Sequence, residues 1–186
     1  MSDSKLEPKI VFRAIGPEHR ELIEEGFARL SPDARYLRFF GAKHRLTPGE
    51  LRYLSEPDGD DHFALGAAWL HPSGMLEGLG VARYVRSPDD PRLAHVAVTV
   101  LDEAQGRGLG VGLLRRVAWV ANLRGVARLR FMVLPENVAM RTLLASRRVP
   151  LQLEERTLIA TCPVRTVARF RSRHDPRRAW IGDQRA

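Results

Sequence analysis

The fold is decided by a stretch that reads His95-Val96-Ala97-Val98-Thr99-Val100-Leu101 and, three residues later, Gln105-Gly106-Arg107-Gly108-Leu109-Gly110. Its first part is apolar on both faces, which predicts a strand in the interior of a sheet. Its second part is a glycine-rich loop that opens a helix from about Leu109 to Leu123, with Gly125 ending the helix. Small residues before a helix N-terminus leave backbone N–H groups exposed, so we expect this loop to bind an anion, and phosphate in particular.

Two common phosphate-binding patterns do not fit this loop. A Walker A motif requires a Gly-Lys pair, and the sequence contains none. A dinucleotide-binding loop requires a third glycine, but Val111 takes that position when the pattern starts at Gly106, and Leu113 when it starts at Gly108. The loop also follows the fourth predicted strand rather than the first. Both readings are therefore excluded.

The surrounding elements predict one α+β domain at residues 1–163 and a basic tail at residues 164–186. Extended patterns predict strands at Lys9–Ile15, Phe63–Leu70, Leu76–Val85, Leu93–Leu101 and Ala127–Leu134, and a last strand or hairpin at Pro150–Cys162. Helical patterns and capping signals predict helices at Pro17–Leu30, after Ser31-Pro32, after Thr47-Pro48 and at Glu136–Arg147.

Charge and composition limit the function classes. The chain has 186 residues and a formal net charge of +8, and residues 104–186 hold 17 basic and 5 acidic side chains. That half could face a nucleic acid, an anionic cofactor or an acidic protein, or it could be a solvated surface without a partner. A single cysteine, Cys162, excludes a disulfide framework and a cysteine-rich zinc module, and we expect it to be a structural strand residue.

Targeting and metal signals are absent from the sequence. No apolar run approaches the ~18 residues that a membrane-spanning helix needs, so we expect no membrane segment. Met1 to Lys5 has no apolar signal core behind it, and we expect a cytoplasmic protein. His44, His62 and His71 lack the spacing of metal ligands, so we expect no metal site.

The loop does fit the pattern Gln-x-x-Gly-x-Gly, and here the sequence resembles the GNAT superfamily of acetyl-CoA-dependent N-acetyltransferases. The strand before the loop, the helix after it, the strand Arg128–Leu134 and the run Pro135-Glu136-Asn137-Val138-Ala139-Met140 all belong to the match. The run Arg35-Tyr36-Leu37-Arg38-Phe39-Phe40 resembles the N-terminal part of bacterial Pat-type protein-lysine acetyltransferase domains. The resemblance implies a GNAT-like α+β fold, with a mixed, twisted sheet of six to seven strands flanked by helices in three layers.

The resemblance also implies a site for acetyl-CoA as cosubstrate. The backbone of Val98 and Val100 would pair with the pantetheine arm, and Asn137 would contact that arm from the second motif. The backbone amides of the loop would hold the pyrophosphate, and this set consists of Gln105, Gly106, Arg107, Gly108, Leu109 and Gly110. The acceptor implied is an amine, either a small molecule or, as the Pat-type resemblance favours, a protein lysine.

Acyl transfer needs an unprotonated amine, and a lysine amine with a pKa of ~10.4 must first lose a proton. His95 stands where many relatives carry a catalytic glutamate, so it is either the general base or a side chain that lines the pocket. Glu136 is a second candidate for proton transfer, although a first-turn glutamate facing the helix dipole explains it as well. The general acid of many relatives, a tyrosine, is replaced here by Leu144, and their Gly-Phe pair is replaced by Arg148-Val149.

Some alternatives remain open. Tyr36 and Arg38 could line the mouth of an acceptor site or pack a pair of helices. The chain could be a catalytically weak acyl-CoA-binding sensor, which the replacements at His95 and Leu144 favour. A nucleic-acid-binding module is supported by charge alone, and we expect no nucleic-acid partner. The sequence leaves the oligomeric state open, a homodimer included.

Overall fold

The computed structural model of the chain describes residues 7–170. Its centre is a seven-stranded sheet with the strand order β1-β2-β3-β4-β5-β7-β6. All neighbouring strands are antiparallel except β4 and β5, which are parallel. The strands are β1 (Lys9–Ala14), β2 (His62–Leu70), β3 (Leu76–Arg86), β4 (Leu93–Val100), β5 (Arg128–Val133), β6 (Gln152–Glu154) and β7 (Thr157–Pro163).

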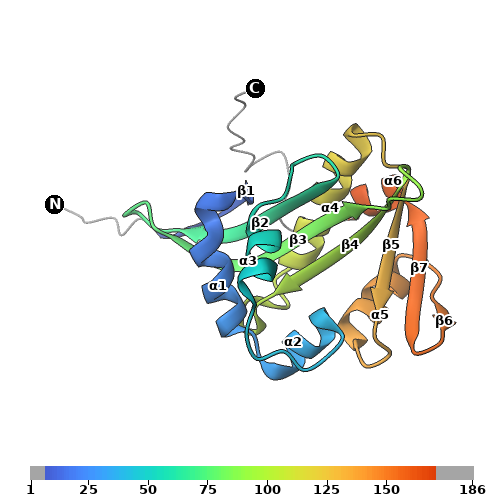
Figure 1. Cartoon of the computed structure of the whole chain (residues 1–186), viewed down its shortest axis with the longest axis horizontal. Helices are drawn as coiled ribbons and strands as arrows, with labels where there is room; N and C mark the ends of the chain where they lie inside the picture. The colour runs from blue at the N-terminus through green and yellow to red at the C-terminus, as the bar shows by residue number, and fades with distance from the viewer. Residues whose placement is uncertain (1–6, 171–186) are drawn as a thin grey trace.

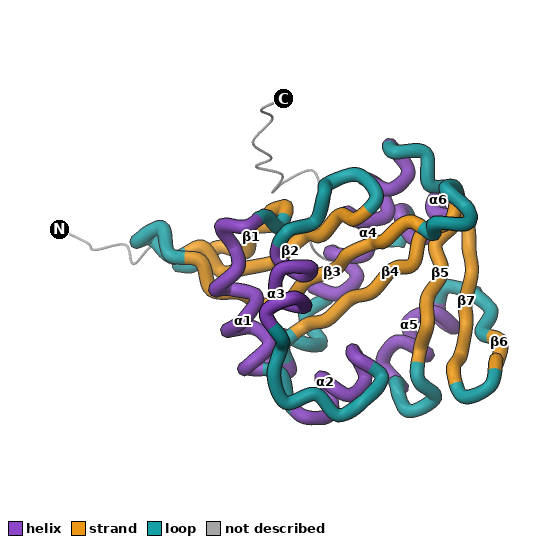
Figure 2. The backbone as a smooth tube through the Cα atoms, in the orientation of Figure 1, coloured by secondary structure: helices purple, strands orange, loops and turns teal. Residues whose placement is uncertain are grey.

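Helices cover both faces of this sheet (Figures 1 and 2). In the view of Figure 1, α1 and α3 lie in front of β1 to β3, and α4 lies behind the sheet. The predicted α+β architecture, a mixed sheet of six to seven strands between helices, is confirmed. The helices are α1 (Arg20–Arg29), α2 (Pro32–Phe39), α3 (Pro48–Ser55), α4 (Leu109–Leu123), α5 (Val138–Ser146) and α6 (Val164–Ala168), with 3-10 turns at Pro17–His19 and Asp102–Ala104.

The core lies mainly between α4 and the sheet. The apolar face of α4 presents Leu113, Leu114 and Val117, each without exposed surface, toward β2, β3 and β4. The predicted N-caps of two helices are confirmed: the Ser31 hydroxyl accepts from the Ala34 N–H, and Thr47 and Glu50 form a reciprocal capping box. These caps fix where α2 and α3 begin, and so place both helices against the face of the sheet opposite α4.

The β2–β3 hairpin contains a bulge next to Gly80, where β3 lies very close to β4. The register shifts between Ala67 and Ala68, and Leu79 is the extra residue on β3. A Cβ at Gly80 would lie 2.7 Å from the Thr99 carbonyl oxygen of β4. Only glycine therefore allows β3 to approach β4 this closely.

Two predicted helices have different boundaries in the structure. The helix predicted at Pro17–Leu30 is split, because the Gly16 N–H donates to Nδ1 of His19 and closes a tight turn before α1. The helix predicted at Glu136–Arg147 begins at Val138, because Asn137 is its N-cap. Glu136 thus lies outside the first turn, and the role we expected for it there, facing the helix dipole, is wrong.

The boundary that we predict at residue 163 is also corrected. Residues 164–170 belong to the folded domain: Val164 and Val167 of α6, and Phe170 after it, are buried in the core. Their helical spacing was obscured by the arginines between them. The rest of the predicted basic tail, residues 171–186, lies outside the described residues.

Neither a membrane span nor a metal cluster is found in the described part of the chain. No helix between residues 7 and 170 is long and apolar enough to cross a membrane. Within the same residues, no group of three or more His, Cys, Asp or Glu side chains is arranged to hold a metal ion.

Candidate functional site

The central feature of the site is the place where β4 and β5 separate. The two strands pair only at Leu93–Arg128, Ala94–Leu129 and His95–Arg130. Beyond His95, β4 continues to pair with β3 as far as Val100, and no strand of the described residues pairs with its other edge. Figure 1 shows the two strands diverging toward their carboxyl ends. This opening exposes backbone groups in the middle of the sheet.

The residues that face the opening follow from the hydrogen bonds of β4. The Leu93 carbonyl accepts from the Ser87 N–H, and the Leu101 N–H donates to the Leu79 carbonyl, so odd-numbered residues direct their backbone groups toward β3. Because the direction alternates along a strand, Val98 and Val100 direct theirs toward β5 and into the opening. These are the two residues predicted to pair with an extended, amide-bearing ligand.

The glycine-rich loop is fastened to the end of β4 by Gln105. Its Nε2 donates to the Val100 carbonyl oxygen at 3.1 Å and to Oδ1 of Asp102 at 3.1 Å. The Val100 carbonyl is therefore already used, which leaves its N–H for the opening. Gln105 acts here through its side chain, a role that the resemblance did not imply, and it sets the distance between loop and strand.

The backbone of the loop turns at two glycines before α4 begins. Gly106 and Gly108 have φ values of 72° and 83°, in the left-handed region that glycine enters without strain. Among residues 7–170 no side chain caps the first turn of α4, and the first N–H groups of a helix have no acceptor within it. The Leu109 side chain is buried, so only its amide can contact a ligand. Arg107 is exposed on the loop.

Gly110 joins the loop to the strand opening. A Cβ at this position would lie 3.6 Å from Cγ2 of Val100 and 3.9 Å from Cγ2 of Val98. The N-terminus of α4 therefore lies directly over the side chains of the two residues whose backbone groups face the opening. A helix N-terminus with uncapped amides is an anion site, since the dipole favours negative charge there.

The predicted residues of the second motif lie at the end of β5. Since β4 and β5 are parallel, their carboxyl ends reach the same edge of the sheet, and Asn137 stands across the opening from the loop. Oδ1 of Asn137 accepts from the Met140 N–H at 3.0 Å, which leaves the amide nitrogen to donate to a ligand. Glu136 is exposed. Arg130 is the partner of His95, and the part of β5 from Arg130 to Val133 already spans ~10 Å, with Glu136 farther along the chain. The structure does not bring Glu136 and His95 together.

His95 lies at the vertex of the opening, in the last pair before the strands part. Burial lowers the pKa of its imidazole, and the guanidinium of Arg130 lowers it further. The side chain is therefore neutral near pH 7 and able to accept a proton. Arg130 is held in place by a hydrogen bond from its Nε to Oγ1 of Thr161.

The face of the sheet opposite α4 carries a second arrangement, which the sequence did not indicate. Arg83 of β3 is buried; its Nη1 donates to Nε2 of His62 at 2.9 Å, and its Nη2 donates to the Leu54 carbonyl at 3.0 Å. Burial, and secondarily the charge of Arg38, lowers the pKa of Arg83 to about 10. Burial and the charge of Arg83 lower the pKa of His62 to about 4, so this histidine accepts the hydrogen bond as a neutral ring.

Other residues discussed in the sequence take structural positions. Leu144 has no exposed surface, so α5 offers no hydroxyl there. Arg116 of α4 is buried, with its guanidinium 3.6 Å from the centre of the Phe12 ring, and so adds nothing to the surface charge of the helix. Trp119 of α4 is half-exposed. Cys162 is a buried strand residue, as predicted, and burial raises the pKa of its thiol to about 11.

Comparison with known proteins gives consistent relatives, although no model of a protein family matches the chain. The chain is 31% identical to Acetyltransferase PA5475 of Pseudomonas aeruginosa over 134 residues. The alignment covers 72% of this chain and 71% of that protein. It is 35% identical over 133 residues to Acetyltransferase Pat of Mycolicibacterium smegmatis, covering 71% of this chain but 38% of that longer protein.

The fold comparison agrees with these relatives. The crystal structure of the GNAT domain of S. lividans PAT superimposes with a TM-score of 0.72 at 26% identity, over 82% of this chain and 89% of that one. The divergent β4–β5 pair, the loop on α4 and these relatives lead to one assignment. The chain belongs to the GNAT superfamily of acetyltransferases and resembles the Pat-type domains within it.

Proposed function

We propose that this chain is a cytoplasmic N-acetyltransferase that moves an acetyl group from acetyl-CoA to an amine within a ternary complex. The observation that carries the proposal is the opening beyond the His95–Arg130 pair, with the N-terminus of α4 at its end. An extended arm that bears amides fits along β4, and a pyrophosphate fits the amides of the loop.

The residues present fit this cosubstrate at both of its polar parts. The N–H and carbonyl of Val98 and the N–H of Val100 face the opening, where the pantetheine amides would complete their hydrogen bonds. The amides from Gly106 to Gly110 and the side chain of Arg107 supply positive potential for the phosphates. Asn137 would donate to the arm from the opposite side.

The transfer step follows from the position of His95 at the vertex. The amine nitrogen attacks the thioester carbonyl carbon; the C–N bond forms, the C–S bond breaks, and coenzyme A leaves as its thiolate. A ring nitrogen of His95, directly or through water, takes the proton that the amine must lose. The Val98 N–H would stabilise the negative charge that develops on the carbonyl oxygen. Since Leu144 replaces the tyrosine of many relatives, the thiolate takes its proton from water.

Release of coenzyme A thiol over a panel of amines and lysine peptides tests the proposal. We expect release with at least one acceptor, together with acetyl-CoA binding in its absence. Binding without release from any acceptor would instead indicate an acyl-CoA sensor. Absence of binding would remove the cosubstrate itself, and salt-dependent DNA or RNA binding insensitive to acetyl-CoA would indicate a nucleic-acid module.

A further inference from the structure

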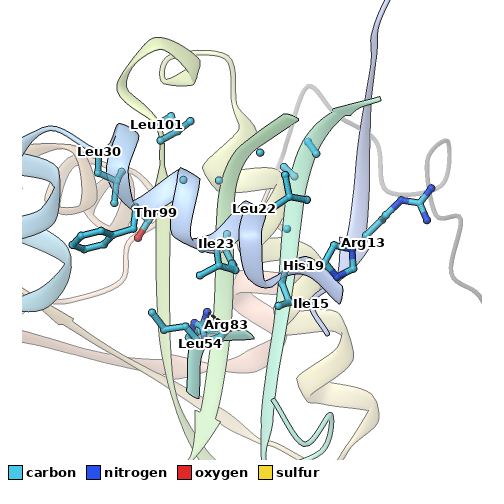
Figure 3. Close-up of a pocket in the computed structure, with 18 of the residues that line it drawn as sticks. Arg13, Ile15, His19, Leu22, Ile23, Leu30, Leu54, Arg83, Thr99 and Leu101 are labelled. Carbon is cyan, nitrogen blue, oxygen red and sulfur yellow. Dashed lines mark hydrogen bonds between the residues drawn. The ribbon is translucent and has the colours of Figure 1, made fainter. Parts of the chain in front are cut away.

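A cavity of about 110 Å³ lies between α1 and the face of the sheet opposite α4 (Figure 3). Its walls are almost entirely apolar and include Leu22 and Ile23 of α1, Ile15 after β1, and Leu54 of α3. An engineered apolar cavity of ~150 Å³ in another protein binds benzene, so this one can hold an apolar group of about four to six carbon atoms.

The cavity exists because small residues stand where side chains would otherwise fill the space. Gly26 of α1 faces Gly66 of β2 and Gly78 and Gly80 of β3 around it. A Cβ at Gly26 would have no atom within 4 Å. Close packing is the rule in protein interiors, so an open space of this size needs an explanation.

One end of the cavity is strongly polar. Arg38 of α2 and Arg83 of β3 both line it. Burial lowers the pKa of both guanidinium groups, and the charge of Arg38 further lowers that of Arg83. Among residues 7–170, neither arginine forms an ion pair with a carboxylate. Arg83 is buried and Arg38 is half-buried, and an anion placed between the two like charges would relieve both the repulsion and the desolvation.

A third polar group, the hydroxyl of Thr99, also indicates a polar ligand in the cavity. Oγ1 of Thr99 is buried without a hydrogen-bond partner in the described residues, and its residue lines the same cavity. In Figure 3, Thr99 and Arg83 extend from neighbouring strands toward the side chains of α1. A buried hydroxyl without a partner is costly, so it indicates a polar atom supplied from outside the chain.

The polar end lies beside the vertex of the β4–β5 opening. Arg83 is the cross-strand partner of Ala97, and His95 is the partner of Val85. Residues 95, 97 and 99 of β4 share one face, because side chains alternate along a strand. Directly opposed and diagonal neighbours in a sheet are ~5–8 Å apart. Arg83 and His95 thus stand on the same face of two neighbouring strands.

We propose that the acetyl acceptor is a free α-amino acid with an apolar side chain, an inference that rests on the proposed function. Its carboxylate binds Arg83 and Arg38, its side chain enters the cavity, and its amino group lies toward His95. The amino group and the carboxylate share one carbon atom, so both would be met from the single sheet face that carries His95 and Arg83. In the reaction, the ammonium form of the amino acid and acetyl-CoA give the N-acetyl amino acid, coenzyme A thiol and one proton.

The observations favour this acceptor over two others. The ε-amine of a protein lysine brings no carboxylate to this position, so the two arginines would stay without an ion pair. A longer acyl chain on coenzyme A would fill the apolar part of the cavity but would leave Arg38 and Arg83 without an anion and Oγ1 of Thr99 without a hydrogen-bond partner. Both alternatives are distinguishable outcomes of the same assay.

The first experiment measures coenzyme A release with L-leucine, L-leucinamide, 3-methylbutylamine and a lysine peptide. A charge-assisted pair is worth ~1.5–3 kcal/mol, so we expect leucine to exceed leucinamide and 3-methylbutylamine by about 10- to 100-fold in kcat/KM. Acetylation of the lysine peptide with no activity on leucine overturns the proposal and leaves the proposed function standing. Transfer of hexanoyl in place of acetyl, with leucine inactive, overturns it in favour of an acyl-chain pocket.

Variants of the lining residues provide the second experiment. Gly26→Leu fills the cavity, and we expect it to abolish activity on leucine while acetyl-CoA binding is unchanged. Glu25→Leu adds the same side chain at an exposed position of α1 and is the control. Arg38→Met should raise KM for leucine at least about 10-fold, with partial rescue by Arg38→Lys. Equal KM values in the parent and Arg38→Met overturn the proposal.

Direct binding keeps the proposal testable if no transfer is seen. Calorimetric titration of leucine into the protein saturated with coenzyme A should give heat in the parent and none in Gly26→Leu. Binding without turnover supports the site and counts against the proposed reaction. No heat in the parent overturns the site.

Discussion

The proposed role of His95 as a general base depends on its position where β4 and β5 separate. The same side chain in the middle of a closed sheet would only pack. At the vertex it borders the opening, and its pKa is lowered by burial and by Arg130, so that the neutral form dominates near pH 7. A weaker base that is already unprotonated is suited to accept a proton at neutral pH.

We predict that His95→Ala lowers kcat by about 10²-fold and leaves acetyl-CoA affinity unchanged, because general bases contribute ~10²–10⁴-fold. In the parent protein, kcat should fall as pH decreases through a pKa below 6.5, where His95 becomes protonated. Stopped assays between pH 5 and pH 8 measure this. The acid limb should be absent in His95→Ala and in His95→Gln, which keeps the size of the side chain. An unchanged kcat in either variant contradicts the assignment.

His62 gives a prediction for stability. Its pKa is about 4 in the folded chain, below the ordinary 6.5, because it is buried beside Arg83. Between these values the unfolded chain binds a proton that the folded chain does not, so stability must fall as the pH drops from 6.5 toward 4. The loss expected between pH 7 and pH 4.5 is about 2–3 kcal/mol.

Urea unfolding at both pH values tests this prediction in the parent, in His62→Gln and in His44→Gln. The His62→Gln variant should lose less stability on acidification, since glutamine offers Arg83 an acceptor that does not titrate. His44 is exposed, so His44→Gln should follow the parent. An identical acid-induced loss in all three proteins would refute the account of His62.

Single residues can be proposed from the sequence where a local pattern marks them, and not where only the fold brings them together. Gln105, Gly106, Gly108 and Gly110 belong to one continuous motif. Arg83 and Arg38 come from a strand and a helix 45 residues apart, and no local signal joins them. Glu136 is expected at the first position of the helix but lies two residues before α5, because Asn137 is the N-cap.

At the scale of elements, the loop between β4 and α4 determines where an anion can bind. Its geometry depends on backbone angles that glycine alone adopts freely. Gly106 has a φ of 72° and Gly74, in the distant β2–β3 turn, has a φ of 85°. A Cβ at either position would have no atom within 4 Å. An alanine would therefore suffer the same backbone strain at both positions, and only Gly106 lies in the loop before α4.

We predict that Gly106→Ala and Gly74→Ala each lower stability by about 1–2 kcal/mol, the cost of a left-handed alanine. Only Gly106→Ala should weaken acetyl-CoA binding, by at least about 10-fold, because relief of the strain turns the loop amides away from the helix axis. Calorimetric titration of acetyl-CoA into both variants measures the difference. Equal affinities would mean that the loop does not hold the pyrophosphate.

The elements themselves were predicted closely where caps and turns are explicit in the sequence. Ser31 and Thr47 begin α2 and α3 as expected, and the hairpin of β2 and β3 is within a residue of its predicted ends. The separation of β4 from β5 could not be predicted from the residues themselves, since the apolar run Leu93–Leu101 is uniform along its length. Pairing between strands is a tertiary property, and only the resemblance implied it.

At the scale of the molecule, the net charge of +8 overstates the positive charge that is available to bind a partner. Arg116 and Arg83 are buried, and Arg29, Arg86 and Arg128 are paired with carboxylates. The positive potential that remains relevant is that of the loop and the N-terminus of α4. The sheet separates this anion site from the cavity on the other face, and β4 borders both.

The most direct test of the account is to identify the product of transfer. The protein is mixed with acetyl-CoA labelled with deuterium in the acetyl methyl group and with equal amounts of leucine, 3-methylbutylamine and a lysine peptide. Mass spectrometry then shows which nitrogen carries the label. The account predicts labelled acetyl on an amine nitrogen, with N-acetyl-leucine as the main product and none formed by His95→Ala in the same time. Labelled acetate alone, with every amine unmodified, would contradict it.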